Sequence, residues 1–113
     1  MFVNYEEYIN SQAWRDKRQK YFESKLPQRC WACNKRKAAG FHIHHRTYKR
    51  LGNEYLRDLV LLCPGCHTGV HKLQKTSGMR LWGSTNHYIR AKRKELNLPP
   101  NAVSQNQPRT IKA

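Results

Sequence analysis

Acidic residues and long apolar runs are what this sequence has least of. Seven Asp and Glu residues stand against 22 Lys and Arg in 113 residues, which gives a formal net charge of +15. So large an excess on a short chain predicts a polyanionic partner, and nucleic acid is the first candidate. A membrane partner is not predicted, because the chain has neither a long apolar stretch nor a lipidation motif. The first residues, MFVNYEEY, lack the basic and apolar regions of a secretory signal, so we expect a cytoplasmic protein.

Cysteines are also few, but they are regularly spaced. The four form two Cys-x-x-Cys pairs, Cys30/Cys33 and Cys63/Cys66. In a reducing compartment this pattern favours zinc over disulfides, and four thiolates complete a tetrahedral structural site. A thioredoxin-like redox role is disfavoured, because that motif needs strands alternating with helices in a longer chain. We therefore expect one small domain whose modest core is supported by a structural zinc ion.

Four histidines lie close to these cysteines. His67 and His71 are four residues apart, so on a helix their imidazoles share one face, which is ligand spacing. His44 and His45 are adjacent, within a segment, residues 41–45, whose alternation predicts a strand. In a regular strand these two side chains point to opposite faces. The strand must therefore end or bend at this point if both histidines serve one site.

The remaining patterns predict three parts: an N-terminal helical segment (residues 1–29), a core (30–75) and a basic C-terminal extension (76–113). The expected elements are a helix over residues 4–24 capped by Asn4 with a break at Ser11, a strand over 41–45, a buried strand over 59–62, a helix that begins at Pro64, loops at 77–78 and 83–84, a basic helix over 87–96, and a flexible tail from Asn97.

The chemistry-bearing residues together resemble a known family. Cys30-x-x-Cys33, His44-His45, Asp58-Leu59 five residues before Cys63, and Cys63-x-x-Cys66-His67 are similar to the motif of the HNH endonucleases. The match spans about residues 30–71, and small stand-alone members of this family resemble phage-encoded proteins. The resemblance implies an α+β fold built on a ββα-metal (His-Me finger) core, with a structural zinc ion held by the four cysteines.

The resemblance also implies residue roles. His45 would be the general base that activates water, and His44, His67 and His71 would hold one catalytic divalent ion. Three imidazoles suit Mn, Ni, Co or Zn better than Mg, which prefers oxygen ligands. Asp58 stands where many family members have an asparagine that spans the loop and helps to orient the base. An aspartate can accept the same hydrogen bonds, although it cannot donate when ionised.

The loop after the histidine pair is basic. Arg46, Lys49 and Arg50 are either phosphate contacts or solvated charges, and we favour a phosphate contact for Arg46, whose guanidinium fork would lie beside the scissile site. Trp31 and Trp82 can stack on bases, but packing is the favoured interpretation for each.

The predicted function is metal-dependent hydrolysis of DNA phosphodiester bonds. The alternative is a non-catalytic, zinc-stabilised nucleic-acid-binding module, or a DNA-packaging accessory protein that recruits a partner enzyme.

Overall fold

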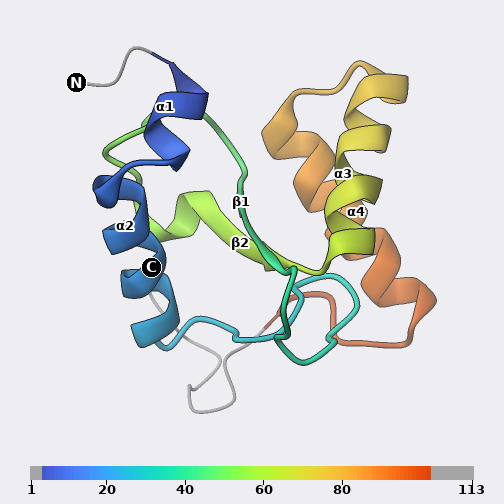
Figure 1. The fold of residues 1–113 in the computed structure, drawn as a ribbon. Helices are drawn as coiled ribbons and strands as arrows, with labels where there is room; N and C mark the ends of the chain where they lie inside the picture. Colours follow the sequence, from blue (N-terminus) through green and yellow to red (C-terminus); the bar gives the residue numbers. More distant parts are fainter. Residues whose placement is uncertain (1–3, 103–113) are drawn as a thin grey trace.

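The computed structural model describes residues 4–102 of the chain. Within them, four α-helices surround a two-stranded antiparallel sheet, so the predicted α+β class is confirmed. Figure 1 shows the sheet in the centre, with α1 and α2 on one side and α3 and α4 on the other. The elements in chain order are α1 (Tyr5–Ile9), α2 (Gln12–Glu23), β1 (His42–His45), a 3-10 turn η1 (Leu56–Asp58), β2 (Leu59–Leu62), α3 (Pro64–Ser77) and α4 (Leu81–Glu95).

Both faces of the sheet are covered, and the two-residue period of the strands decides which side chains face which helices. Leu59 and Leu61 of β2 pack with aromatic residues of α1 and α2. Val60 and Leu62 point the other way and pack with residues of α3 and α4 and with the cysteines. All four are fully buried. The predicted buried strand over residues 59–62 is therefore confirmed, and its continuous apolar run follows from burial on both faces.

The first two helices follow the capping signals of the sequence. The Asn4 side chain accepts a hydrogen bond from the Glu7 amide (2.7 Å), and the Ser11 hydroxyl accepts one from the Trp14 amide (3.2 Å). Each cap satisfies an amide that the first turn of a helix leaves free. The predicted break at Ser11 is confirmed, because α1 ends at Ile9 and Ser11 is the N-cap of α2.

The C-terminal helices differ from the prediction at two places, the first being Ser77, which was expected in a loop and is the last residue of α3. The pair Gly83-Ser84, expected in a loop, lies in the first turns of α4, which begins at Leu81. The Ser84 side chain is buried and its hydroxyl bonds back to the Arg80 carbonyl (3.0 Å), so local and tertiary contacts outweigh the low helix propensity of glycine. Close packing of α4 on α3 is visible at Gly69, where an added Cβ would lie 2.5 Å from the Tyr88 ring.

Among residues 4–102, no helix combines the length and the apolar character needed to cross a bilayer. The flexible tail predicted from Asn97 falls mostly on residues 103–113, which lie outside the described residues.

Candidate functional site

The four cysteines form one cluster. Their sulfur atoms lie within 4.8 Å of one another, and the cluster can hold a structural metal ion such as zinc. One pair comes from the turn before β1, and the other from the end of β2 and the first turn of α3, where Cys63 is the N-cap. Four thiolates at this spacing match the tetrahedral ligand set that zinc prefers in structural sites.

Backbone amides are directed at the sulfurs in both pairs. The Cys33 amide points at Cys30 Sγ (3.5 Å), and the Cys66 amide points at Cys63 Sγ (3.4 Å). The first turn is tight enough to need a left-handed residue, which is Asn34, with φ of 68°. A hydrogen bond from the Cys66 thiol lowers the pKa of Cys30 to about 4 against the opposing effect of burial, and backbone amides add to the lowering. Burial raises the pKa of Cys33 to about 11, and the hydrogen bond to Cys30 raises the pKa of Cys66, so without an ion Cys30 is the cysteine that is favoured as thiolate, the form that binds a metal.

A second group of ligand atoms lies on the α3 side of the sheet. His44 of β1 meets His67 and His71 of α3, and one nitrogen of each lies within 4.8 Å of the others. The Nε2 atoms of His67 and His71 are 3.2 Å apart, as the four-residue spacing on one helix face predicts. Burial lowers the pKa of His44 to about 2 and that of His67 to about 4, with neighbouring histidines adding to both shifts. These two rings are therefore neutral near neutral pH, which is the form that binds a metal.

Thr85 of α4 determines which nitrogen of His44 is free. The Thr85 hydroxyl has one proton and donates it to the Leu81 carbonyl (2.7 Å). It therefore accepts from His44 Nε2, which lies 2.9 Å away. Because Nε2 carries the ring proton, Nδ1 has the free lone pair. Such outer contacts fix the orientation of metal-binding histidines.

His45 points to the opposite face of the sheet, as the strand period requires. Its Nε2 lies 2.6 Å from Glu54 Oε2, and the other oxygen of Glu54 accepts a 2.6 Å hydrogen bond from the Tyr8 hydroxyl. Within residues 4–102, Nδ1 of His45 is buried and has no hydrogen-bond partner. A proton on Nδ1 would be an unpaired buried donor, so Nε2 carries the proton and donates to Glu54.

Aromatic rings surround His45. Trp14 stacks on its imidazole with ring centroids 4.7 Å apart, and Tyr5 and Tyr48 lie at 5.9 Å and 5.7 Å. The residue is only 2% exposed. The side chain predicted to be the base is thus held in a fixed orientation beneath α1, on the face of the sheet opposite to His44.

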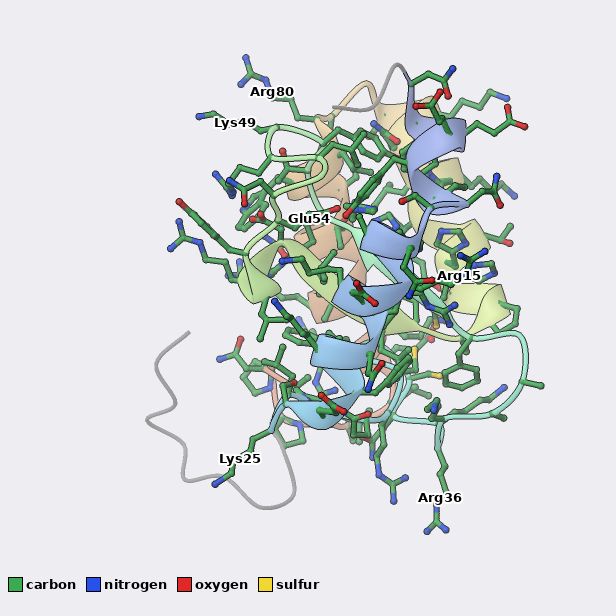
Figure 2. All side chains as sticks on the ribbon, turned by 60° about the vertical axis from the view of Figure 1, so that its left-hand side comes forward. Arg15, Lys25, Arg36, Lys49, Glu54 and Arg80 are labelled. Atoms are coloured by element: carbon green, nitrogen blue, oxygen red, sulfur yellow. The ribbon has the colours of Figure 1, made fainter. Side chains whose placement is uncertain are left out.

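Glu54 was missed by sequence reasoning. Burial raises its pKa, but the hydrogen bonds from His45 and Tyr8 outweigh burial, and the net shift is downward. Glu54 is therefore an ionised carboxylate inside the protein, where Figure 2 shows it lying among the packed side chains. The one signal in the sequence is an acid within a loop that is rich in lysines and arginines.

The Asp58 side chain bonds to residues of the loop that precedes it, Arg50 and Tyr55. Its carboxylate pairs with the Arg50 guanidinium through two contacts, one of them Nε to Oδ2 at 2.7 Å, and it accepts the Tyr55 amide (3.0 Å). Its side chain is fully buried, and the hydrogen bond from Arg50 lowers its pKa. Its carbonyl accepts the Arg46 amide at 2.7 Å. Asp58 thus braces the loop between the strands, and it also occupies Arg50, one of the three cations predicted to contact phosphate.

The other two predicted phosphate contacts differ from each other. The Arg46 guanidinium is engaged by the Arg57 carbonyl and by Asn86 of α4 (Nη1 to Oδ1, 3.0 Å). Lys49 is exposed, and in Figure 2 it projects away from the body of the protein. Arg57 is an exposed cation of the same loop that the sequence did not single out.

The chain matches no protein-family model, and no curated protein or solved structure is significantly similar to it.

Proposed function

We propose that this protein is a metal-dependent endonuclease that hydrolyses DNA phosphodiester bonds. The observation that carries the proposal is the convergence of His44, His67 and His71 beside a separate cluster of four cysteines. Because four sulfurs already complete a structural site, the imidazoles are available for a second ion. When bound, a divalent ion such as Mn, Ni, Co, Zn or Mg supplies Lewis acidity that stabilises negative charge on the scissile phosphate and the leaving oxygen. The net charge of +15 supports a polyanionic substrate.

His45 is the proposed general base. Its Nδ1 takes a proton from water as the water oxygen attacks phosphorus. The bond from phosphorus to O3′ breaks, and solvent protonates the departing oxygen, which leaves 5′-phosphate and 3′-hydroxyl ends. Glu54 is a positioning residue in this step, because its carboxylate fixes the tautomer of His45 and stabilises the positive charge that the ring gains.

Substrate access involves both faces of the sheet. β1 ends at His45, so His44 and His45 lie at the same end of the sheet although their side chains diverge. A phosphodiester that crosses this end can contact groups from both faces. Because His45 is buried, the proposal requires neighbouring rings to move aside, and those of Tyr5 and Tyr48 belong to residues that are 42% and 47% exposed.

The test is cleavage of supercoiled plasmid by zinc-loaded protein, after removal of weakly bound ions and addition of Mn, Ni, Co, Zn or Mg one at a time. Parent protein should cut only with an added ion. His45→Ala and His71→Ala should each lose cutting while their zinc content and circular dichroism stay as in the parent. His87→Ala is the matched control, since this exposed histidine lies outside both ligand groups and should cut normally.

Two outcomes would overturn the proposal. One is undiminished cutting by His45→Ala. The other is no cutting with any ion by folded, zinc-loaded parent protein that binds DNA, which would favour the non-catalytic binding or packaging module.

A further inference from the structure

A shallow groove lies between the β1–β2 loop and the start of α4. It has a volume of about 440 Å³ and is lined by Thr47, Lys49, Arg50 and Arg57 of the loop and by Trp82 of α4. No lining residue is acidic. The volume falls within the range of about 300–1,000 Å³ that is typical of small-ligand sites. The groove thus combines one flat aromatic ring with three cationic side chains.

Trp82 is held in place with much of its ring uncovered. It is 40% exposed, whereas Trp31 packs against the buried residues on both faces of the sheet. The Arg46 guanidinium lies 4.5 Å from the Trp82 ring centroid and covers part of the ring. The Arg46 guanidinium donates hydrogen bonds to Asn86 of α4 and to the Arg57 carbonyl of the loop, and these bonds hold it against the Trp82 ring. The exposed remainder of the indole ring lines the groove as a rigid platform.

Two of the cations are available to a ligand. Arg50 is paired with buried Asp58, but within residues 4–102 neither Lys49 nor Arg57 forms an ion pair. The nearest recorded partner of the Arg57 guanidinium is the Tyr55 ring, 5.0 Å away. Two cations that form no ion pair within residues 4–102 therefore lie beside an exposed aromatic ring.

We propose that this groove binds an unpaired nucleotide of single-stranded DNA, with the base stacked on Trp82 and neighbouring phosphates bound by Lys49 and Arg57. Bases in a duplex stack on one another and do not offer their faces, so an exposed indole selects unpaired bases. Tyr48 and Tyr55, exposed by 47% and 51% in the same loop, offer further rings. The inference rests on the proposed function and adds to it that the preferred substrate contains a single-stranded segment.

Binding can be measured without cutting. Zinc-loaded protein, with no other divalent ion present, is titrated into fluorescein-labelled oligo-dT and into a blunt duplex of equal length at one salt concentration. The parent should bind the single strand more tightly. Trp82→Ala should weaken single-strand binding by roughly 5- to 100-fold, the range for one lost stacking contact, and should change duplex binding by less than about threefold.

Two further variants separate stacking from damage to the fold. Trp82→Phe should keep most of the affinity, because it retains a ring, but should abolish the quenching of tryptophan fluorescence by oligo-dT. Lys49→Ala should weaken binding and reduce its salt dependence by about one counter-ion. Lys25→Ala is the matched control, since this exposed lysine lies outside the groove and should have a smaller effect.

Equal affinity of the parent for single strand and duplex would overturn the inference, as would equal losses for both in Trp82→Ala. These outcomes are distinct from a failure of the proposed nuclease, which concerns metal-dependent cutting. Stacking on Trp82 without any cutting would support the groove as a binding site and contradict the nuclease proposal. Metal-dependent cutting without stacking would support the nuclease proposal and contradict the groove as a binding site.

Discussion

Replacement of Glu54 by glutamine tests the link between the buried carboxylate and the proposed base. The carboxylate accepts two hydrogen bonds of 2.6 Å, from His45 Nε2 and from the Tyr8 hydroxyl. A glutamine amide of the same shape has only one acceptor oxygen and adds an NH₂ group. If both neighbours kept their protons, one buried donor would be unpaired, at a cost of about 1–3 kcal/mol.

The imidazole can avoid that conflict by changing tautomer. Nε2 of His45 would then accept from the amide, and the ring proton would move to Nδ1, the atom proposed to take a proton from water. We expect Glu54→Gln to lose about 10⁴-fold in cutting, the scale at which a misplaced tautomer disables a catalytic histidine. The free energy of unfolding should fall by only about 1–3 kcal/mol.

The decisive assay is ¹⁵N NMR of the His45 ring at a pH where the ring is neutral, since the two nitrogens differ in shift according to which carries the proton. The parent should have the proton on Nε2 and Glu54→Gln should have it on Nδ1. Tyr8→Phe is the matched control: it removes the other hydrogen bond to the same carboxylate, at a cost of about 1–2 kcal/mol, and should leave the tautomer unchanged. An identical tautomer in parent and Glu54→Gln would refute this reasoning.

Three further predictions concern stability. Cys63→Ala should bind no structural zinc and should unfold. The binding free energy of a structural zinc ion, about 10–16 kcal/mol, is as large as the whole free energy of unfolding of a typical domain, about 5–15 kcal/mol. A native circular dichroism spectrum without zinc would contradict this prediction. Arg50 lowers the pKa of Asp58 from its ordinary 3.8, so the ion pair stabilises the fold above that value and is lost as the pH falls through the lower, folded-state value. In urea titrations the difference in free energy of unfolding between the parent and Asp58→Asn should therefore become smaller as the pH is lowered. A difference that does not change with pH would show that the Arg50–Asp58 ion pair is not its cause. Gly69→Ala places a methyl group against the Tyr88 ring of α4 and should lower the free energy of unfolding by about 1–3 kcal/mol. Gly65→Ala is the control, because its added methyl group meets nothing within 4 Å, and its free energy of unfolding should be unchanged or higher by up to about 1 kcal/mol. Thermal melts measure both.

The elements that could be predicted from the sequence depend on neighbours along the chain. Asn4 and Ser11 cap helices whose amides lie three residues away, and Pro64 begins α3 because its missing amide is not needed there. His67 and His71 share a face by helix geometry alone. In each case the physical cause acts within one turn of chain, so a linear pattern contains it.

The parts that could not be predicted depend on contacts between distant segments. Glu54 meets Tyr8 from 46 residues away, and His44 meets Thr85 from 41 residues away. Nothing near Glu54 in the sequence distinguishes a buried acid from a solvated one. Packing was the favoured interpretation for Trp82, yet the residue is 40% exposed. It lies in the first turn of α4, which begins six residues before the predicted start.

The alternation of β1 has a consequence for how this protein tolerates insertions. His44 and His45 are chemically identical, and only odd or even position along the strand sends one toward threonine and two other imidazoles and the other toward a carboxylate. One residue inserted into β1 ahead of the pair would turn each side chain to the other face of the sheet, and two would return each to its own face at a displaced position along the strand. The two histidines therefore differ only in whether they occupy an odd or an even position of the strand. Insertions or deletions of an even number of residues in β1 keep each histidine on its own face of the sheet.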